Sequence, residues 1–320
     1  MRWYSWIICL GLLALMGQNA QAQFQNGDII VGEFFDDFLR VNSGTVTDLY
    51  DIERSDNFTH LEIADSHTAY VVNFTEIWKI DIASGSETTL VDLGGVSSNE
   101  IIMGLDGHLL VSNAGTGISR VDVNTGGVST VYDATFFNPS DICISSEGFI
   151  YVTEFFDGLG RVNTDGSWTK LGDWDVNFFS HLDLGPDGFL YATTTFEGGD
   201  LYRINPSSGS GVKIADDLFT FIDDLQVAAD GSIYLAGATD TTGDSLVNDL
   251  VMKIDPLTGQ WEVVVDDTMV GDPSPPFFNP MDLVIYDGNF YSAVPEPGSA
   301  VILVGLAVGS LGWRRRRAFA

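Results

Sequence analysis

Basic residues are scarce in this sequence, and their scarcity excludes a class of partners. The chain has 320 residues, with 14 lysines and arginines against 45 aspartates and glutamates, and its formal net charge is −31. A surface of that sign repels the phosphates of nucleic acids and anionic lipid headgroups, and it attracts divalent cations and cationic partners. We therefore expect no nucleic-acid partner.

Cysteine is nearly absent as well, with 2 residues in the whole chain. Cys9 lies in an N-terminal segment that we expect to be removed, so Cys143 remains alone and no disulfide can form within the mature chain. Cys143 stands in an apolar, alternating stretch with no histidine near it in the sequence. These surroundings favour a buried, unreactive thiol over a nucleophile.

Long apolar runs are confined to the two ends. Residues 1–22 combine Arg2, an apolar run and the pair Ala20-x-Ala22, which predicts a signal peptide cleaved after Ala22. Residues 298–313 are uncharged and apolar, and the length of this segment is marginal for a membrane span of roughly 30 Å. Four arginines follow this segment, and we expect them to stay cytoplasmic. They are Arg314, Arg315, Arg316 and Arg317. Residues 23–293 are left as the folded body.

The order of features in residues 294–320 is distinctive. Pro295, Glu296 and Pro297 lie in the motif at 294–297, ahead of the apolar segment and the arginine cluster. This arrangement resembles the PEP-CTERM sorting signal. The resemblance implies a Gram-negative bacterium, export through the inner membrane, transient anchoring in it and recognition by an exosortase. The protein would then reach the cell surface or the extracellular matrix, and in that family the tail is often linked to exopolysaccharide export. The alternative is a plain C-terminal anchor.

The body repeats itself. The stretch "EFFDDFLRVN", which begins at Glu33, returns as "EFFDGLGRVN" at Glu154, and turn positions recur about every 40 residues. The repeated turn positions are Gly27, His67, Gly107, Gly148, Gly188, Gly231 and Gly288. Most units contain short strands in which apolar and polar residues alternate, joined by Asp-Gly or a similar turn. This combination is typical of a β-hairpin. Four short strands in each unit predict the blade of a β-propeller.

Six inner strands can be identified. They are expected at His60–Ile63, Glu100–Met103, Asp141–Ile144, His181–Leu184, Asp224–Val227 and Asp282–Ile285. The chain begins on a second strand, and the last inner strand stands at the far end of the body. Completing one blade from both ends would remove an open sheet edge. The sequence therefore predicts an all-β, six-bladed propeller closed by its N- and C-terminal strands, and we expect a monomer.

The phrase "PSDICISSEGFIYV", Pro139–Val152, carries a family resemblance. It is similar to the blades of six-bladed propellers of the NHL-repeat, gluconolactonase (regucalcin) and virginiamycin B lyase group. In gluconolactonase-like enzymes a divalent ion lies in the central channel, bound by Glu, Asn and Asp side chains. Their opening "E-G-P-x-W" is absent here, since Glu33 is followed by Phe34, and their other ligand motifs are replaced. The resemblance implies the architecture more strongly than the reaction.

Every inner strand opens with Asp, Glu or His. These residues are His60, Glu100, Asp141, His181, Asp224 and Asp282, and symmetry would gather them at one mouth of the channel. Glu33 and Glu154, which end second strands, would point towards the same rim. Converging carboxylates must be protonated or neutralised by a cation. Oxygen ligands suit Ca²⁺ or Mg²⁺, and the two imidazoles would also admit Zn²⁺, manganese or iron. The alternative is structural, because such residues can bond the backbone of the neighbouring blade.

Two functions remain open from the sequence. The first is a binding or scaffold module whose rim engages a carbohydrate or exopolysaccharide, a cation or a protein. The second is a metal-dependent hydrolase or lyase acting on a sugar lactone or polysaccharide, with His60 or His181 as general base.

Overall fold

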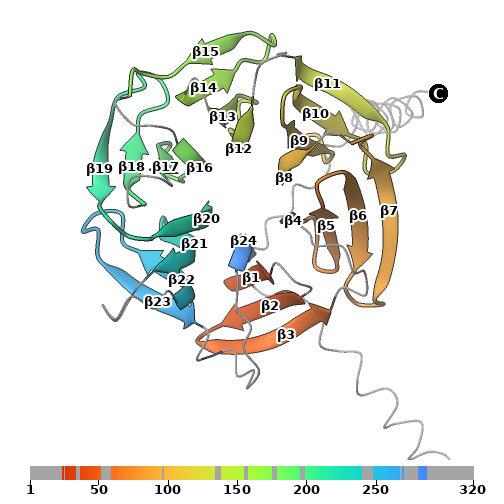
Figure 1. Cartoon of the computed structure of the whole chain (residues 1–320), viewed down its shortest axis with the longest axis horizontal. Coiled ribbons are helices and arrows are strands. Elements are labelled where there is room, and N and C mark those ends of the chain that lie inside the picture. Colours follow the sequence, from red (N-terminus) through yellow and green to blue (C-terminus); the bar gives the residue numbers. More distant parts are fainter. Residues whose placement is uncertain are drawn as a thin grey trace, which may run out of the picture.

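The structure is a computed structural model in which 24, 26–33, 37–51, 59–95, 97–133, 138–154, 158–174, 179–194, 199–239, 248–266, 269 and 280–286 are described. These residues form a ring of six antiparallel sheets of four strands each, arranged around one axis (Figure 1). The prediction of a six-bladed propeller is confirmed.

The strands follow the chain from blade to blade. The first blade contains β1 (Asp28–Glu33), β2 (Asp37–Asn42) and β3 (Thr45–Asp51), with β24 (Pro280–Tyr286) as its inner strand. The second contains β4 (His60–Ile63), β5 (Thr68–Val72), β6 (Glu76–Asp81) and β7 (Ser86–Asp92). The third contains β8 (Ser98–Met103), β9 (Leu109–Asn113), β10 (Gly117–Val121) and β11 (Val128–Asp133).

The remaining blades repeat this order. The fourth contains β12 (Pro139–Ile144), β13 (Ile150–Glu154), β14 (Gly158–Val162) and β15 (Trp168–Lys170). The fifth contains β16 (Phe179–Leu184), β17 (Leu190–Thr194), β18 (Leu201–Ile204) and β19 (Gly211–Ala215). The sixth contains β20 (Phe221–Val227), β21 (Ile233–Thr239), β22 (Asn248–Ile254) and β23 (Trp261–Asp266).

The first blade closes the ring. Strand β24 pairs antiparallel with β1, opposing Val284 to Ile30 and Leu283 to Val31. The pairing places strands from the two ends of the body in one sheet, as the sequence predicted. Strand β1 is therefore paired on both sides, with β24 and with β2, and is not left as an open edge.

The hydrophobic core lies between the blades. Each of six buried clusters draws its side chains from two neighbouring blades. The largest fully buried side chains include Trp78, Phe38 and Phe179. Successive side chains of a strand point to opposite faces of the sheet, so apolar residues in a row cover both faces. The adjoining blades bury both of these faces.

Five inner strands start two or three residues before their predicted first residue. In the third, fourth and sixth blades the pairing register shifts immediately before Glu100, Asp141 and Asp224. A register shift inserts an unpaired residue, bends the strand and re-aims the next side chain. It also breaks the alternation in the sequence, which explains why the predicted strands began too late.

The predicted terminal segments lie outside the described residues. This holds for the signal peptide at 1–22 and for the tail at 294–320, including Pro295, Glu296, Pro297 and the four arginines. Within the described ranges, no helix is long and apolar enough to cross a membrane.

Candidate functional site: a ring of carboxylates and imidazoles in the channel

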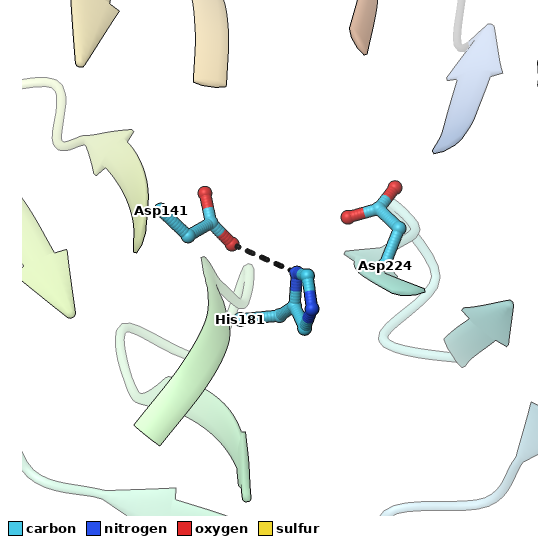
Figure 2. Close-up of side chains that lie close together, drawn as sticks. All are labelled: Asp141, His181 and Asp224. Carbon is cyan, nitrogen blue, oxygen red and sulfur yellow. Dashed lines mark ion pairs between the residues drawn. The ribbon is translucent and has the colours of Figure 1, made fainter. Parts of the chain in front are cut away.

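The six residues that were predicted to open the inner strands lie on six successive blades around one channel. Around the axis their order is Asp282, His60, Glu100, Asp141, His181 and Asp224. Figure 2 shows Asp141, His181 and Asp224 converging from three neighbouring blades. A cavity of about 470 Å³ occupies the channel, and Glu100, Asp141 and Asp282 line it.

The ring aspartates join neighbouring blades. Asp141 accepts hydrogen bonds from its own strand at Ile142 N (2.5 Å) and from the next blade at Leu182 N (2.7 Å). Asp224 does the same with Leu225 N (2.6 Å) and Leu283 N (2.8 Å). These aspartates therefore bond the backbone of the neighbouring blade, which is the structural role that the sequence left open.

Asp282 completes this set of bridges. It accepts from Leu283 N at 2.8 Å and from Leu61 N of the second blade. A carboxylate has about four lone-pair sites and these bonds use two. Asp224 and Asp282 also form a side-chain hydrogen bond with each other, so each aspartate keeps at least one lone pair for a further ligand.

The two histidines differ in their contacts. His60 Nδ1 lies 3.1 Å from Glu100 Oε2 and 3.8 Å from Asp282 Oδ2. His181 Nε2 lies 3.2 Å from the carbonyl oxygen of Ile222, while its Nδ1 is 3.9 Å from Asp141 Oδ2. Nδ1 is buried in both rings and has no partner of hydrogen-bond geometry.

Burial controls the protonation of the ring. It raises the pKa of Glu100, Asp141 and Asp282 well above the usual range, and the neighbouring carboxylates raise it further. It lowers the pKa of His60 to about 4 and that of His181 to about 3. At neutral pH the imidazoles are therefore neutral and cannot balance the carboxylates.

Two acidic residues that the sequence analysis missed form a second layer. Glu62 accepts a hydrogen bond from Met103 N (3.0 Å), and Asp183 accepts from Leu184 N (2.6 Å) and Val227 N (2.7 Å). Both line the cavity. Burial raises the pKa of Glu62 to about 8 and that of Asp183 to about 7. Each follows a ring histidine by two residues, in "HLE" and "HLD", and that repeat could have revealed them.

The placing of Glu33 and Glu154 at the rim of the ring stays a prediction. Glu154 is 1% exposed, and its Oε1 accepts a hydrogen bond from Asn138 N at 2.8 Å. Glu33 is half-buried at the end of β1. Neither lines the cavity, which instead reaches Ala64, Pro186 and Ala228 near the turns after the inner strands. The cavity thus occupies the half of the channel opposite the predicted rim.

The tail of the chain matches a family model. The PEP-CTERM protein-sorting motif matches residues 293–317. The chain carries a PEP-CTERM sorting motif. The motif indicates a protein that is exported and processed by an exosortase in a Gram-negative bacterium. No curated protein matches the sequence.

Solved structures resemble the body in fold. A protein of unknown function from Bacteroides caccae has a TM-score of 0.61 at 13% identity, covering 81% of this chain and 98% of that one. Catalytically inactive virginiamycin B lyase from Staphylococcus aureus, solved with quinupristin, has a TM-score of 0.56 at 15% identity, covering 75% and 86%. A putative gluconolactonase has a TM-score of 0.51 at 16% identity, covering 64% and 77%. At these identities the likeness shows the propeller fold alone.

Proposed function

We propose that residues 23–293 form an exported binding module that holds a divalent cation in its channel. The module would reach the cell surface or extracellular matrix once an exosortase has acted on the tail at 294–320. Its partner there would be a carbohydrate or a matrix component. The observation that carries the proposal is the ring of four carboxylates and two neutral imidazoles around one channel.

The charge balance of the channel supports a cation. Among the described residues that line the cavity, none is lysine or arginine. Like charges held close together in a buried site must be relieved either by protons or by a counter-ion. A cation would relieve the repulsion among the ring carboxylates that bind it and would make use of the lone pairs that their backbone hydrogen bonds leave free.

The histidines favour binding over turnover. A general base works best with a pKa near the working pH, and burial takes His60 and His181 to about 4 and about 3. Both are weak bases as a result. Cys143, which also lines the cavity, is buried, and burial raises the pKa of its thiol well above the usual range.

The test is metal analysis of the full chain, purified in detergent. After dialysis against Ca²⁺, Mg²⁺ or Zn²⁺, we expect retained metal and a melting temperature that a chelator lowers. Asp141→Asn should reduce the retained metal, whereas the matched change Asp106→Asn, at an exposed turn, should not. A chain that retains none of the three ions contradicts the proposal. Turnover in a screen of sugar lactones and uronate polymers would instead support the hydrolase or lyase.

A further inference from the structure

The ring has an internal symmetry that the fold alone does not require. Around the axis, the triad Asp282–His60–Glu100 is followed by the triad Asp141–His181–Asp224. Each triad places one imidazole between two carboxylates, and the two histidines stand three blades apart. A symmetric ring would offer two equivalent sites, but the contacts of the two histidines make the sites unequal.

The triad around His181 is set up to receive a cation. A carbonyl oxygen only accepts hydrogen bonds, so the contact of 3.2 Å with Ile222 O places the ring proton on Nε2. In the neutral ring Nδ1 therefore carries a lone pair. That lone pair is buried, has no hydrogen-bond partner and faces Asp141 Oδ2 at 3.9 Å, which is also an acceptor. Two acceptors in this position repel each other unless the Asp141 carboxyl is protonated or a cation lies between them.

The distances in this triad suit a shared ion. One ligand atom each from Asp141, His181 and Asp224 lie within 4.8 Å of one another. Backbone groups fix all three side chains, because Leu182 N and Leu283 N hold the aspartates and Ile222 O holds the imidazole. Supporting hydrogen bonds of this kind orient metal ligands and select the histidine tautomer.

The triad around His60 lacks this arrangement. Within the described ranges no carbonyl accepts a hydrogen bond from His60, so its Nδ1 is free to carry the ring proton. Nδ1 lies 3.1 Å from Glu100 Oε2, close enough for a proton on the ring to face that carboxylate. A proton can therefore relieve the repulsion in this triad, and no metal ion is required there.

We propose that the ring binds one transition-metal ion of the Zn²⁺ or Co²⁺ class, with Asp141, His181 Nδ1 and Asp224 as its protein ligands. The inference rests on the proposed function, since it names the ion and the position of the cation in the channel. An imidazole ligand favours Zn²⁺ and Co²⁺ over Ca²⁺ and Mg²⁺, which prefer oxygen ligands alone. Three protein ligands also leave coordination positions open to water or to a bound partner.

The first experiment is a titration of the metal-free full chain with Co²⁺, followed by absorption and proton NMR. We expect saturation at one equivalent and one solvent-exchangeable, metal-shifted signal from the Nε2 proton of a histidine bound through Nδ1. Zn²⁺ should displace Co²⁺, and a large excess of Ca²⁺ or Mg²⁺ should not. This measurement uses the unaltered sequence, so it does not depend on how a variant folds.

The second experiment compares three histidine variants. His181→Asn should weaken Zn²⁺ binding by about 100-fold or more, whereas His60→Asn and His67→Asn should each change it by less than about threefold. His67 is exposed in a turn and serves as the matched control. Melting curves recorded with a chelator should show that the variants fold.

The outcomes separate this inference from the proposed function. Tight Ca²⁺ or Mg²⁺ binding that is insensitive to His181→Asn overturns the transition-metal assignment and leaves a cation-binding module. Two equivalents of Co²⁺, or equal losses in His60→Asn and His181→Asn, overturn the asymmetry of the two triads. Failure to bind any of these ions removes both proposals.

Discussion

The buried carboxyl group of Glu62 predicts that the stability of the protein falls as the pH rises. Burial raises the pKa of Glu62 from 4.5 to about 8, with further contributions from Glu100 and Asp183, despite the opposing hydrogen bond from Met103 N. The unfolded chain releases this proton near pH 4.5, whereas the folded chain keeps it until about pH 8. The stabilisation is complete below the lower value and is lost as the pH rises through the upper one.

The size of the effect follows from the width of that interval. Each pKa unit corresponds to roughly 1.4 kcal/mol, so the full loss for Glu62 approaches about 5 kcal/mol. Glu62→Gln removes the ionisable group and keeps an oxygen to accept the hydrogen bond from Met103 N. We therefore expect the variant and the wild type to unfold with similar free energies at pH 5. At pH 9 the variant should be more stable by up to about 5 kcal/mol, which is on the order of 10 °C in melting temperature for a body of this size.

The assay is chemical and thermal unfolding at both pH values, in the presence of a chelator so that no metal occupies the ring. The control is Glu262→Gln, because Glu262 is exposed on β23 and should show no such dependence. If the stability difference between Glu62→Gln and wild type is the same at pH 5 and at pH 9, the argument from burial is wrong.

Three further predictions test the core, the thiol and the tail. Phe179 is fully buried against the rings of Trp174 and Tyr202, so Phe179→Ala should cost about 3–5 kcal/mol in urea unfolding. A loss below about 1 kcal/mol would contradict this packing. Cys143 is buried and the pKa of its thiol is raised, so a thiol reagent should label it only at the rate at which the protein unfolds. Rapid labelling of the folded protein would refute the burial of Cys143. The arginines at 314–317 belong to the sorting signal, so replacing them by alanine should block processing by the exosortase. Immunoblots of membrane and medium should then show unprocessed precursor in place of the product. Unchanged processing would contradict the role of these arginines.

Local signals explain why the fold could be predicted. The turns after the inner strands need a residue that accepts a positive φ, and Gly148 (φ 85°) and Gly188 (φ 77°) provide it at the repeat spacing. These turns, and the alternation on either side of them, belong to a few neighbouring residues. Their recurrence about every 40 residues was enough to count the blades.

Burial could not be predicted in the same way. Trp78 on β6 is fully buried, whereas Trp261 on β23 is 49% exposed, although both occur in similar alternating stretches. The difference depends on whether the strand lies inside the sheet or at its outer edge. It therefore follows from the assembled blade and not from the residues around each tryptophan.

The amino-acid sequence by itself determined the propeller, the closure of its first blade and the one acidic or histidine position on each of the six inner strands, because these depend on repeat spacing, turn chemistry and alternation. The tertiary structure alone decided how those residues act. The register shifts before Glu100, Asp141 and Asp224 aim their side chains, and the carbonyl of Ile222, 41 residues from His181 along the chain, selects the tautomer of that ring. Contacts between blades join residues that are distant in the sequence, and no local pattern records which of them will meet.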